Sequence, residues 1–443
     1  MRKTFLILIL LAATNLTFAQ KVFSLKDCMN YAVENSPKYK IQEAKNKNAD
    51  LDFRESYLSF IPSISASASA TASFGRSIDP ETNTYTNTTS FSNSYGIYGS
   101  YTIFNGFSTV NNYRIAKTSR LMGAEDAKLL KDDICLQTIQ AYYNVIYYSG
   151  MMNLAKSQLE ESETSLKSIK LREELGLSGQ ADVLQAEAIV AGNEFNLVQQ
   201  KNNVEQTIII LKGIMSFPKD ENLLIDTIIS NKDEVISNAI IPENVIAAAK
   251  SFSPKLKTKE QNLKVAEYKL KTAKWSLLPR LYLEGGYNTG YVNYIGMGSN
   301  KKFWDQIKDM QGQYIYLGMN IPIFSALSLQ GNVSKNKNLL AIAQYEYAEQ
   351  VNEVEIEVLR ATQDLSGAIK EFYQAKKQAE MQEMAHKLNK RKYEEGMISI
   401  LELHASSNQL LAANAQMLNA RFQYIIKNKV VKYYKGEHYM DQD

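Results

Sequence analysis

The chain has 443 residues, and its 50 lysine and arginine residues nearly balance its 47 acidic residues. A protein that binds nucleic acid would need a basic surface, so this charge argues against that class of partner. Cys28 and Cys135 are too few for a disulfide framework, and either a disulfide between them or two buried thiols fits the sequence. None of His386, His404 and His438 has a second histidine at metal-ligand spacing, so no metal or cofactor is expected.

Residues 1–19 are predicted to be a secretory signal peptide. Arg2 and Lys3 form a basic start, an apolar run follows from Phe5 to Ala13, and Thr17-Phe18-Ala19 is a small-residue cleavage site. The apolar run is shorter than the roughly 20 residues of a spanning helix. No later apolar stretch is long enough either, so any part of the mature chain that enters a membrane must do so as strands.

Two helices and a strand are predicted next. Leu25 to Asn35 has the apolar spacing of a short helix, and Ser36-Pro37 is a favourable start for a second one. That second helix runs to about Phe60 and is stopped by Pro62. From residue 63 to 74, Ser and Thr alternate strictly with Ile, Ala and Phe, which predicts a strand with a hydroxyl face and an apolar face. A serine- and alanine-rich linker is the alternative.

A second strand and a helical hairpin complete this part of the chain. Residues 75–93 have the Ser, Thr and Asn composition of a long surface loop. An aromatic-rich alternation then predicts a strand at about 95–104, in which one face carries Tyr95, Ile97, Gly99, Tyr101 and Ile103. Residues 108–215 show 4-3-4-3 apolar spacing on both sides of a turn, the pattern of coiled-coil helices. Asn193, Gln200 and Thr207 interrupt it, which indicates a side that faces water, either a lumen or ordinary solvent.

The same series of elements then occurs a second time. Residues 103–215 match residues 323–435 without a gap at an offset of 220, and Pro37 and Pro62 match Pro254 and Pro279 at an offset of 217. Two copies of one structural unit are therefore expected. We predict a first repeat at 20–216, a connecting segment at 217–242 with one short strand or helix, and a second repeat at 243–443. The second repeat has strands at about 281–290 and 313–324, a loop at 291–312 and a helical hairpin at about 326–435.

The four strands have the features of transmembrane barrel strands, because each has about ten residues, one apolar face and terminal aromatics. A barrel needs at least about eight strands. Closure therefore requires several chains, and three chains would supply twelve strands. A soluble sheet packed on helices is the alternative.

The order of elements, together with Gly176-Leu177-Ser178-Gly179-Gln180-Ala181-Asp182-Val183 at the turn of the first hairpin, resembles the TolC family of outer-membrane efflux proteins. The helix-to-strand junctions at Pro62 and Pro279 are similar to those of that family. The resemblance implies a mainly α fold with a membrane β-barrel portion. It implies a homotrimer whose barrel lies in outer-membrane lipid and whose helical tunnel extends into the periplasm.

The resemblance also implies roles for the two hairpin turns. Gly176, Leu177 and Ser178 of the first turn, with Gly396 and Met397 of the second, would be the tips where a periplasmic membrane-fusion adaptor docks.

Asp182 and Glu402, which follow the two turns, would form a periplasmic gate. Both also sit where a carboxylate stabilises the start of a helix, so the residues themselves fit either role. The family often has a second acid after Glu402 and a base after Gly396, where this chain has Ala405 and Met397.

A passive exit duct, driven by an inner-membrane transporter of the RND, ABC or another class, is the function that the resemblance implies. A soluble periplasmic coiled-coil adaptor or structural protein is the alternative, and the four amphipathic strands argue against it. No nucleophile–base motif, phosphate loop or metal cluster supports an enzyme.

Overall fold

The computed structural model describes residues 22–78, 83–87, 89–227, 241–295 and 301–442. The predicted signal peptide lies outside these residues. The chain divides into two compact units, one formed by residues 1–43, 126–256 and 350–443, the other by residues 44–125 and 257–349. None of the described helices is long and apolar enough to span a bilayer.

The helices repeat in length as well as in sequence. In the first copy they are α2 (Leu25–Asn35), α3 (Pro37–Leu58), α4 (Ser108–Glu174) and α5 (Gln180–Met215). In the second copy they are α6 (Pro242–Phe252), α7 (Pro254–Trp275), α9 (Ser328–Glu394) and α10 (Ile400–Tyr434). The long helices α4 and α9 both have 67 residues, and the pairs α2/α6 and α3/α7 also agree in length.

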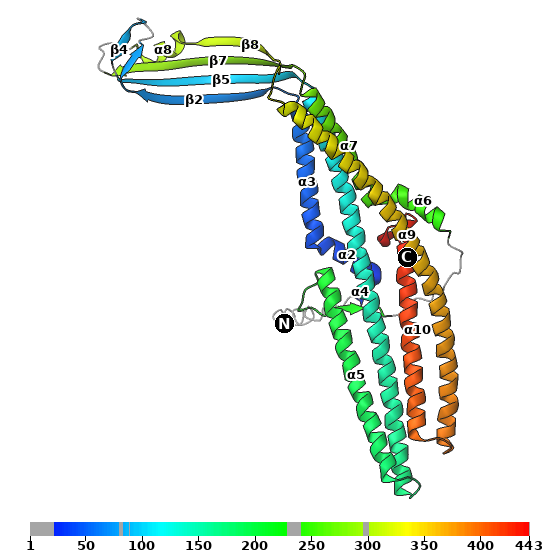
Figure 1. Ribbon diagram of the computed structural model, residues 1–443. Coiled ribbons are helices and arrows are strands. Elements are labelled where there is room, and N and C mark those ends of the chain that lie inside the picture. Colours follow the sequence, from blue (N-terminus) through cyan, green and yellow to red (C-terminus); the bar gives the residue numbers. More distant parts are fainter. Residues whose placement is uncertain (1–21, 79–82, 88, 228–240, 296–300, 443) are drawn as a thin grey trace, which may run out of the picture. The chain divides into compact units, whose positions relative to one another are not determined.

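The first unit is mainly helical, and its core is formed by residues of α2, α4, α5, α9 and α10 (Figure 1). Met29, Ile139, Leu211 and Met215 are almost fully buried there. Cys28 and Cys135 are also buried in this core, and they form no disulfide. Burial raises the pKa of Cys135 to about 12, because the thiolate would be desolvated.

Two short pieces of the chain close this core. The strand β1 (Val22–Phe23) pairs in parallel with β6 (Leu224–Ile225), which is the one regular element of the connecting segment among its described residues. After α10 the short 3₁₀ helix η2 (Tyr439–Asp441) folds back, and the ring of Tyr439 stacks on Tyr433 at 4.9 Å.

Side chains at the heptad positions of the first hairpin are buried between the helices, as the 4-3 spacing predicts. Ile134, Val145, Ala155 and Ile169 are buried along α4. The expectation that Asn193 faces water is wrong, because its side chain is only 6% exposed between the helices.

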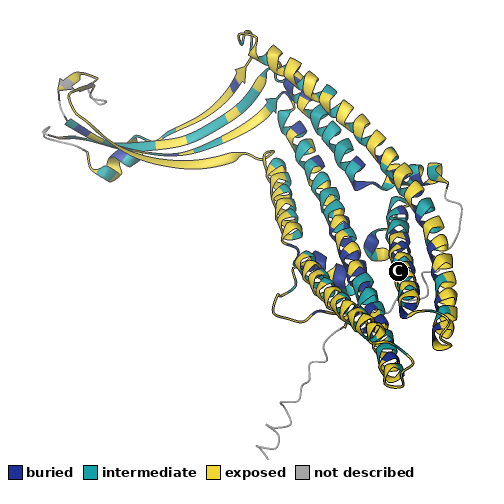
Figure 2. Cartoon of the chain, turned by 60° about the horizontal axis from the view of Figure 1, so that its bottom comes forward, coloured by how far each residue is buried: buried dark blue, intermediate teal, exposed yellow. Residues whose placement is uncertain are grey.

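The second unit contains an antiparallel sheet in the order β2, β5, β7, β8 (Figure 1). The strands are β2 (Ser63–Ser73), β5 (Thr89–Asn105), β7 (Arg280–Ile295) and β8 (Gly312–Asn320). Strand β2 is exposed along its whole length (Figure 2).

Several predicted bounds in the sheet are wrong. The predicted loop at 75–93 is shortened by a small hairpin of β3 (Arg76–Ile78) and β4 (Tyr85–Asn87), and by the early start of β5. Residues from Thr89 onward become strand because they pair with the end of β2 on one side and with the end of β7 on the other. Strand β7 itself runs beyond the predicted 290. The predicted loop at 291–312 contains this strand end and the short helix α8 (Phe303–Asp309).

The last strand ends earlier than predicted, at Asn320 instead of 324. Pro322 follows, and its missing N–H cannot continue a ladder. Strand β5 also has a bulge between Thr102 and Phe104, so Ile103 does not continue the face of Tyr101.

Proline ends the helices α3 and α7 in the same way. Each helix closes with one tight turn, and Pro62 or Pro279 is then the residue directly before β2 or β7. Because proline has no N–H to donate, the helix cannot continue and the chain becomes extended. The structure thus has both prolines at the helix-to-strand junctions that the sequence predicts.

Candidate functional site: the two hairpin tips

The first tip joins α4 to α5 through a left-handed glycine. Gly176 has φ +71°, and no atom lies within 4 Å of the position that a Cβ would take. Its N–H donates to the Glu173 carbonyl at 2.9 Å, and the N–H of Leu177 donates to the Arg172 carbonyl at 2.7 Å. This pair of bonds is the Schellman motif, in which glycine avoids the steric cost of the left-handed conformation.

The second tip joins α9 to α10 with the same geometry. Gly396 has φ +78°, and its N–H donates to Tyr393 at 2.9 Å. The N–H of Met397 donates to Lys392 at 2.8 Å. Leu177 and Met397 thus occupy the same position after their glycines, and they are 76% and 61% exposed. Each tip therefore presents one large apolar side chain to solvent.

The two acids begin the helices that follow. Asp182 accepts the N–H of Gly179 at 3.2 Å and the hydroxyl of Ser178 at 2.8 Å. These two bonds lower the pKa of Asp182 below its ordinary value, because they stabilise the carboxylate. Glu402 accepts the N–H of Ser399 at 2.9 Å, while Ser399 Oγ accepts the N–H of Glu402 at 3.3 Å.

Both acids are exposed, and both have the helix-start role that their positions indicate. The cap of α10 is a complete capping box. The cap of α5 is half of one, because Gly179 has no side chain to return a bond.

The tips pack on each other through a small core. Ile169, Ala186, Tyr393, Ile400 and Leu403 are buried together at the ends of the four helices. Around this core, the Arg172 guanidinium donates to the Glu394 carbonyl at 3.2 Å and lies 5.7 Å from the Tyr393 ring centre. Lys170 on α4 and Glu187 on α5 form an ion pair at 2.7 Å within the first hairpin. The shared core and the contacts of Arg172 hold the first tip against the second.

A polar cluster that the sequence did not predict joins the hairpins further along α4. Glu161 Oε1 lies 3.2 Å from His386 Nε2 and 3.1 Å from Lys390 Nζ, both on α9. Glu161 Oε2 accepts the hydroxyl of Ser407 on α10 at 3.4 Å. Burial acts to raise the pKa of Glu161, but His386 and Lys390 outweigh it and the pKa lies below the ordinary 4.5. No sequence signal marks these contacts, because their partners lie more than 220 residues apart.

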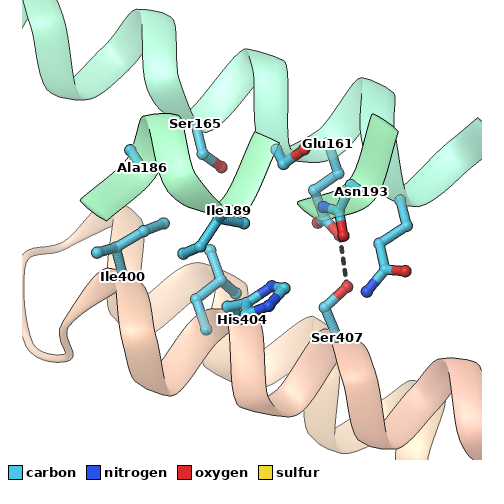
Figure 3. A pocket seen from close by; sticks show the side chains of 11 residues that line it. Glu161, Ser165, Ala186, Ile189, Asn193, Ile400, His404 and Ser407 are labelled. Atoms are coloured by element: carbon cyan, nitrogen blue, oxygen red, sulfur yellow. Dashed lines mark hydrogen bonds between the residues drawn. The ribbon is translucent and has the colours of Figure 1, made fainter. Parts of the chain in front are cut away.

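A pocket opens beside this cluster between α4, α5 and α10 (Figure 3). Ile189, Ile400 and Leu403 form its apolar wall, and Asn193 and His404 lie on its polar side. Burial lowers the pKa of His404, since the charged imidazole would lose solvent. Among the described residues, no group of three or more His, Cys, Asp and Glu side chains could hold a metal ion. The pocket lies where side chains of α4, α5 and α10 meet.

Comparison with known proteins identifies the family. The outer membrane efflux protein family model matches the chain twice, at residues 29–215 and 245–431. The chain belongs to the outer membrane efflux protein family. The two matches correspond to the two copies seen in the sequence and in the helix lengths, and the family consists of channel proteins.

Individual relatives are distant. Nodulation protein T of Rhizobium leguminosarum bv. viciae is 22% identical over 333 residues, which cover 72% of this chain and 64% of that protein. The probable efflux pump outer membrane protein SepC of Pseudomonas putida is 22% identical over 314 residues, covering 70% and 62%. The chain thus spans slightly less than two thirds of the length of these relatives. The solved structure of the outer membrane protein VceC from Vibrio cholerae has a TM-score of 0.76 at 14% identity, covering 93% of this chain and 96% of that one. This last likeness shows a shared fold.

Proposed function

We propose that this protein is the outer-membrane exit duct of a tripartite efflux or type I secretion system. The observation that carries the proposal is the double match of the efflux-protein family, one match for each structural copy. The duct is a passive conduit without cofactor or chemistry of its own. A periplasmic membrane-fusion adaptor and an inner-membrane transporter open it and supply the energy. The alternative of a soluble periplasmic adaptor or structural protein is not favoured, because β2, β5, β7 and β8 form one sheet with an apolar face.

The sheet supports a homotrimer. Strands β2 and β8 are its edges, and neither has a further partner among the described residues. An exposed edge is a template for pairing with another chain. Four strands cannot close a membrane barrel, whereas twelve strands from three copies can. In this arrangement β8 of one copy pairs with β2 of the next, and the apolar face contacts outer-membrane lipid.

The proposal assigns roles to the hairpin tips and keeps the predicted division of the chain. Gly176, Leu177 and Ser178, with Gly396 and Met397, form the adaptor-docking tips, and the exposed Leu177 and Met397 supply apolar contact. Asp182 and Glu402 line the periplasmic entrance. Residues 1–19 direct export and are removed from the mature protein. The two repeats are residues 20–216 and 243–443, joined by the segment 217–242.

Introduced cysteines test the trimer. Tyr316→Cys on β8 is combined in turn with Ser65→Cys, Ser67→Cys and Ser69→Cys on β2, which sample the register between copies. One combination is expected to give a disulfide-linked trimer after oxidation, because paired strands bring Cα atoms within disulfide range. Tyr316→Cys with Ser94→Cys on β5 is the control, since β5 is flanked on both sides by strands of its own chain. Monomers for every combination would contradict the proposal.

A further inference from the structure

The strand register gives the sheet a polar face with three successive rows. The first row is Ser65–Tyr98–Gly286–Tyr314, the second is Ser63–Ser100–Glu284–Tyr316, and the third is Thr102–Tyr282–Gly318. The opposite face contains Ile64, Ile97, Leu283, Ile315 and Leu317. The two faces differ in chemistry along all four strands. If the sheet forms a barrel in lipid, the face with Glu284 is the one that lines the lumen.

Tyrosine rings lie flat on this polar face because the residues beneath them are glycines. A Cβ at Gly318 would overlap the ring of Tyr282. A Cβ at Gly286 would come within 2.5 Å of the Tyr314 ring and 3.0 Å of the Tyr98 ring. The glycines thus leave room for each ring to rest with one face on the sheet and the other turned away from it.

Glu284 is the one acidic residue in the four strands, and Arg280 at the start of β7 is the one basic residue. The Glu284 carboxylate is half-buried and has no ion-pair partner in the described parts of the chain. Tyr316 is its direct cross-strand neighbour, and the rings of Tyr282 and Tyr316 are 5.9 Å apart. Tyr314 and Tyr316 are 44% and 50% exposed. An unpaired carboxylate therefore lies among three accessible aromatic rings.

We propose that Glu284, with Tyr282, Tyr314 and Tyr316, forms a binding site for organic cations on the polar face of the sheet. A carboxylate attracts the positive charge, and the negative face of a tyrosine ring attracts a cation within about 6 Å of its centre. The site selects quaternary ammonium ions and similar organic cations over anions of the same shape. This inference rests on the proposed duct, in which three copies of the site line the lumen of the barrel.

Block of the pore current tests the site. The full-length protein is reconstituted in a planar bilayer, and phenyltrimethylammonium or the anion benzenesulfonate is added to either compartment. Phenyltrimethylammonium is expected to block the wild-type current and benzenesulfonate to leave it unchanged. Glu284→Gln is expected to raise the half-blocking concentration of the cation about fivefold, since an ion pair at a partly exposed site is worth up to about that factor.

Two tyrosine variants separate ring chemistry from a change in fold. Tyr316→Phe keeps the aromatic face, so the cation is expected to block its current at the same concentration as in the wild type. Tyr316→Leu is expected to raise the half-blocking concentration of the cation about threefold. Asn288→Gln, on the same face of β7 and uncharged, is the matched control and should not change the block. Equal block of the wild type, Glu284→Gln and Tyr316→Leu would overturn the cation site while leaving the duct intact. A wild-type protein without pores would instead refute the duct.

Discussion

The two copies of the repeat build the same strand-to-helix turn from different residues. Gly106 and Phe107 have φ values of +62° and +56° before α4, and Ala326 and Leu327 have +47° and +64° before α9. The turn itself therefore does not require glycine. The difference lies in the neighbour, because a Cβ at Gly106 would overlap the Trp275 carbonyl oxygen and lie 2.9 Å from its carbon. Glycine is needed where the end of α7 approaches the backbone, and the second copy tolerates alanine.

Exchange of these two residues should give the largest effect on stability. Gly106→Ala is expected to destabilise the protein by about 2–4 kcal/mol, since a left-handed alanine is strained and its methyl group meets backbone that cannot rotate away. Ala326→Gly, the mirror change, should alter stability by less than about 1 kcal/mol. The midpoint of thermal unfolding in detergent measures both. Equal and small shifts for the two variants would show that the approach of Trp275 is not a constraint.

The copies also differ where the hairpins meet. Glu161 of α4 reaches His386, Lys390 and Ser407, whereas its counterpart at the offset of 220 is Met381, which is 50% exposed. The carboxylate of this link thus comes from the first copy, and the second copy has no acidic residue at the matching position.

The contacts of Glu161 should contribute an intermediate, pH-dependent amount to the free energy of unfolding. The folded-state pKa is depressed, so the stability from the carboxylate is present above 4.5 and is lost as pH falls through the lower folded value. Glu161→Gln is expected to cost about 1–2 kcal/mol at pH 7, and the difference from the wild type should shrink in acid. Thermal unfolding at pH 7 and at lower pH measures it. The exposed neighbour Glu160, changed to Gln, is the control, and an equal effect of both variants at pH 7 would contradict the link.

The helix caps at the tips should give the smallest effect. Ser399→Ala is expected to cost about 1 kcal/mol, because the backbone N–H of Glu402 loses its acceptor. Gly179→Ser should gain a few tenths of a kcal/mol by completing the first box, and a serine Cβ there meets nothing closer than 3.9 Å. Thermal unfolding of the two single variants checks this. A destabilised Gly179→Ser protein would mean that the first tip needs glycine for another reason.

The periodic part of the fold could be predicted from the sequence, because one-sided burial leaves a pattern. The 4-3 spacing predicts α4 and α5, and the strict alternation after Pro62 predicts β2. The early part of β5 could not be predicted, since residues 89–94 become strand through pairing with β2 and β7. Phe91 is the one apolar residue among these six, so the segment shows no apolar side. The helix α8 is too short to show a period.

The candidate site divides in the same way. The glycines at 176 and 396 and the acids at 182 and 402 could be located, because turns and helix starts need particular residue types at fixed spacing. Their gating and docking roles remain proposals. Glu161 could not be found, since its importance comes from partners on α9 and α10 that only the tertiary structure brings near.

Single-channel conductance in a planar bilayer tests the exit-duct proposal most directly. The purified wild-type protein is expected to give a small, cation-preferring conductance, and Asp182→Ala combined with Glu402→Ala is expected to raise it by opening the entrance. A conductance that the double variant leaves unchanged would keep the duct and assign Asp182 and Glu402 to helix capping alone. No conductance, from a monomeric protein that stays in the soluble fraction, would contradict the account.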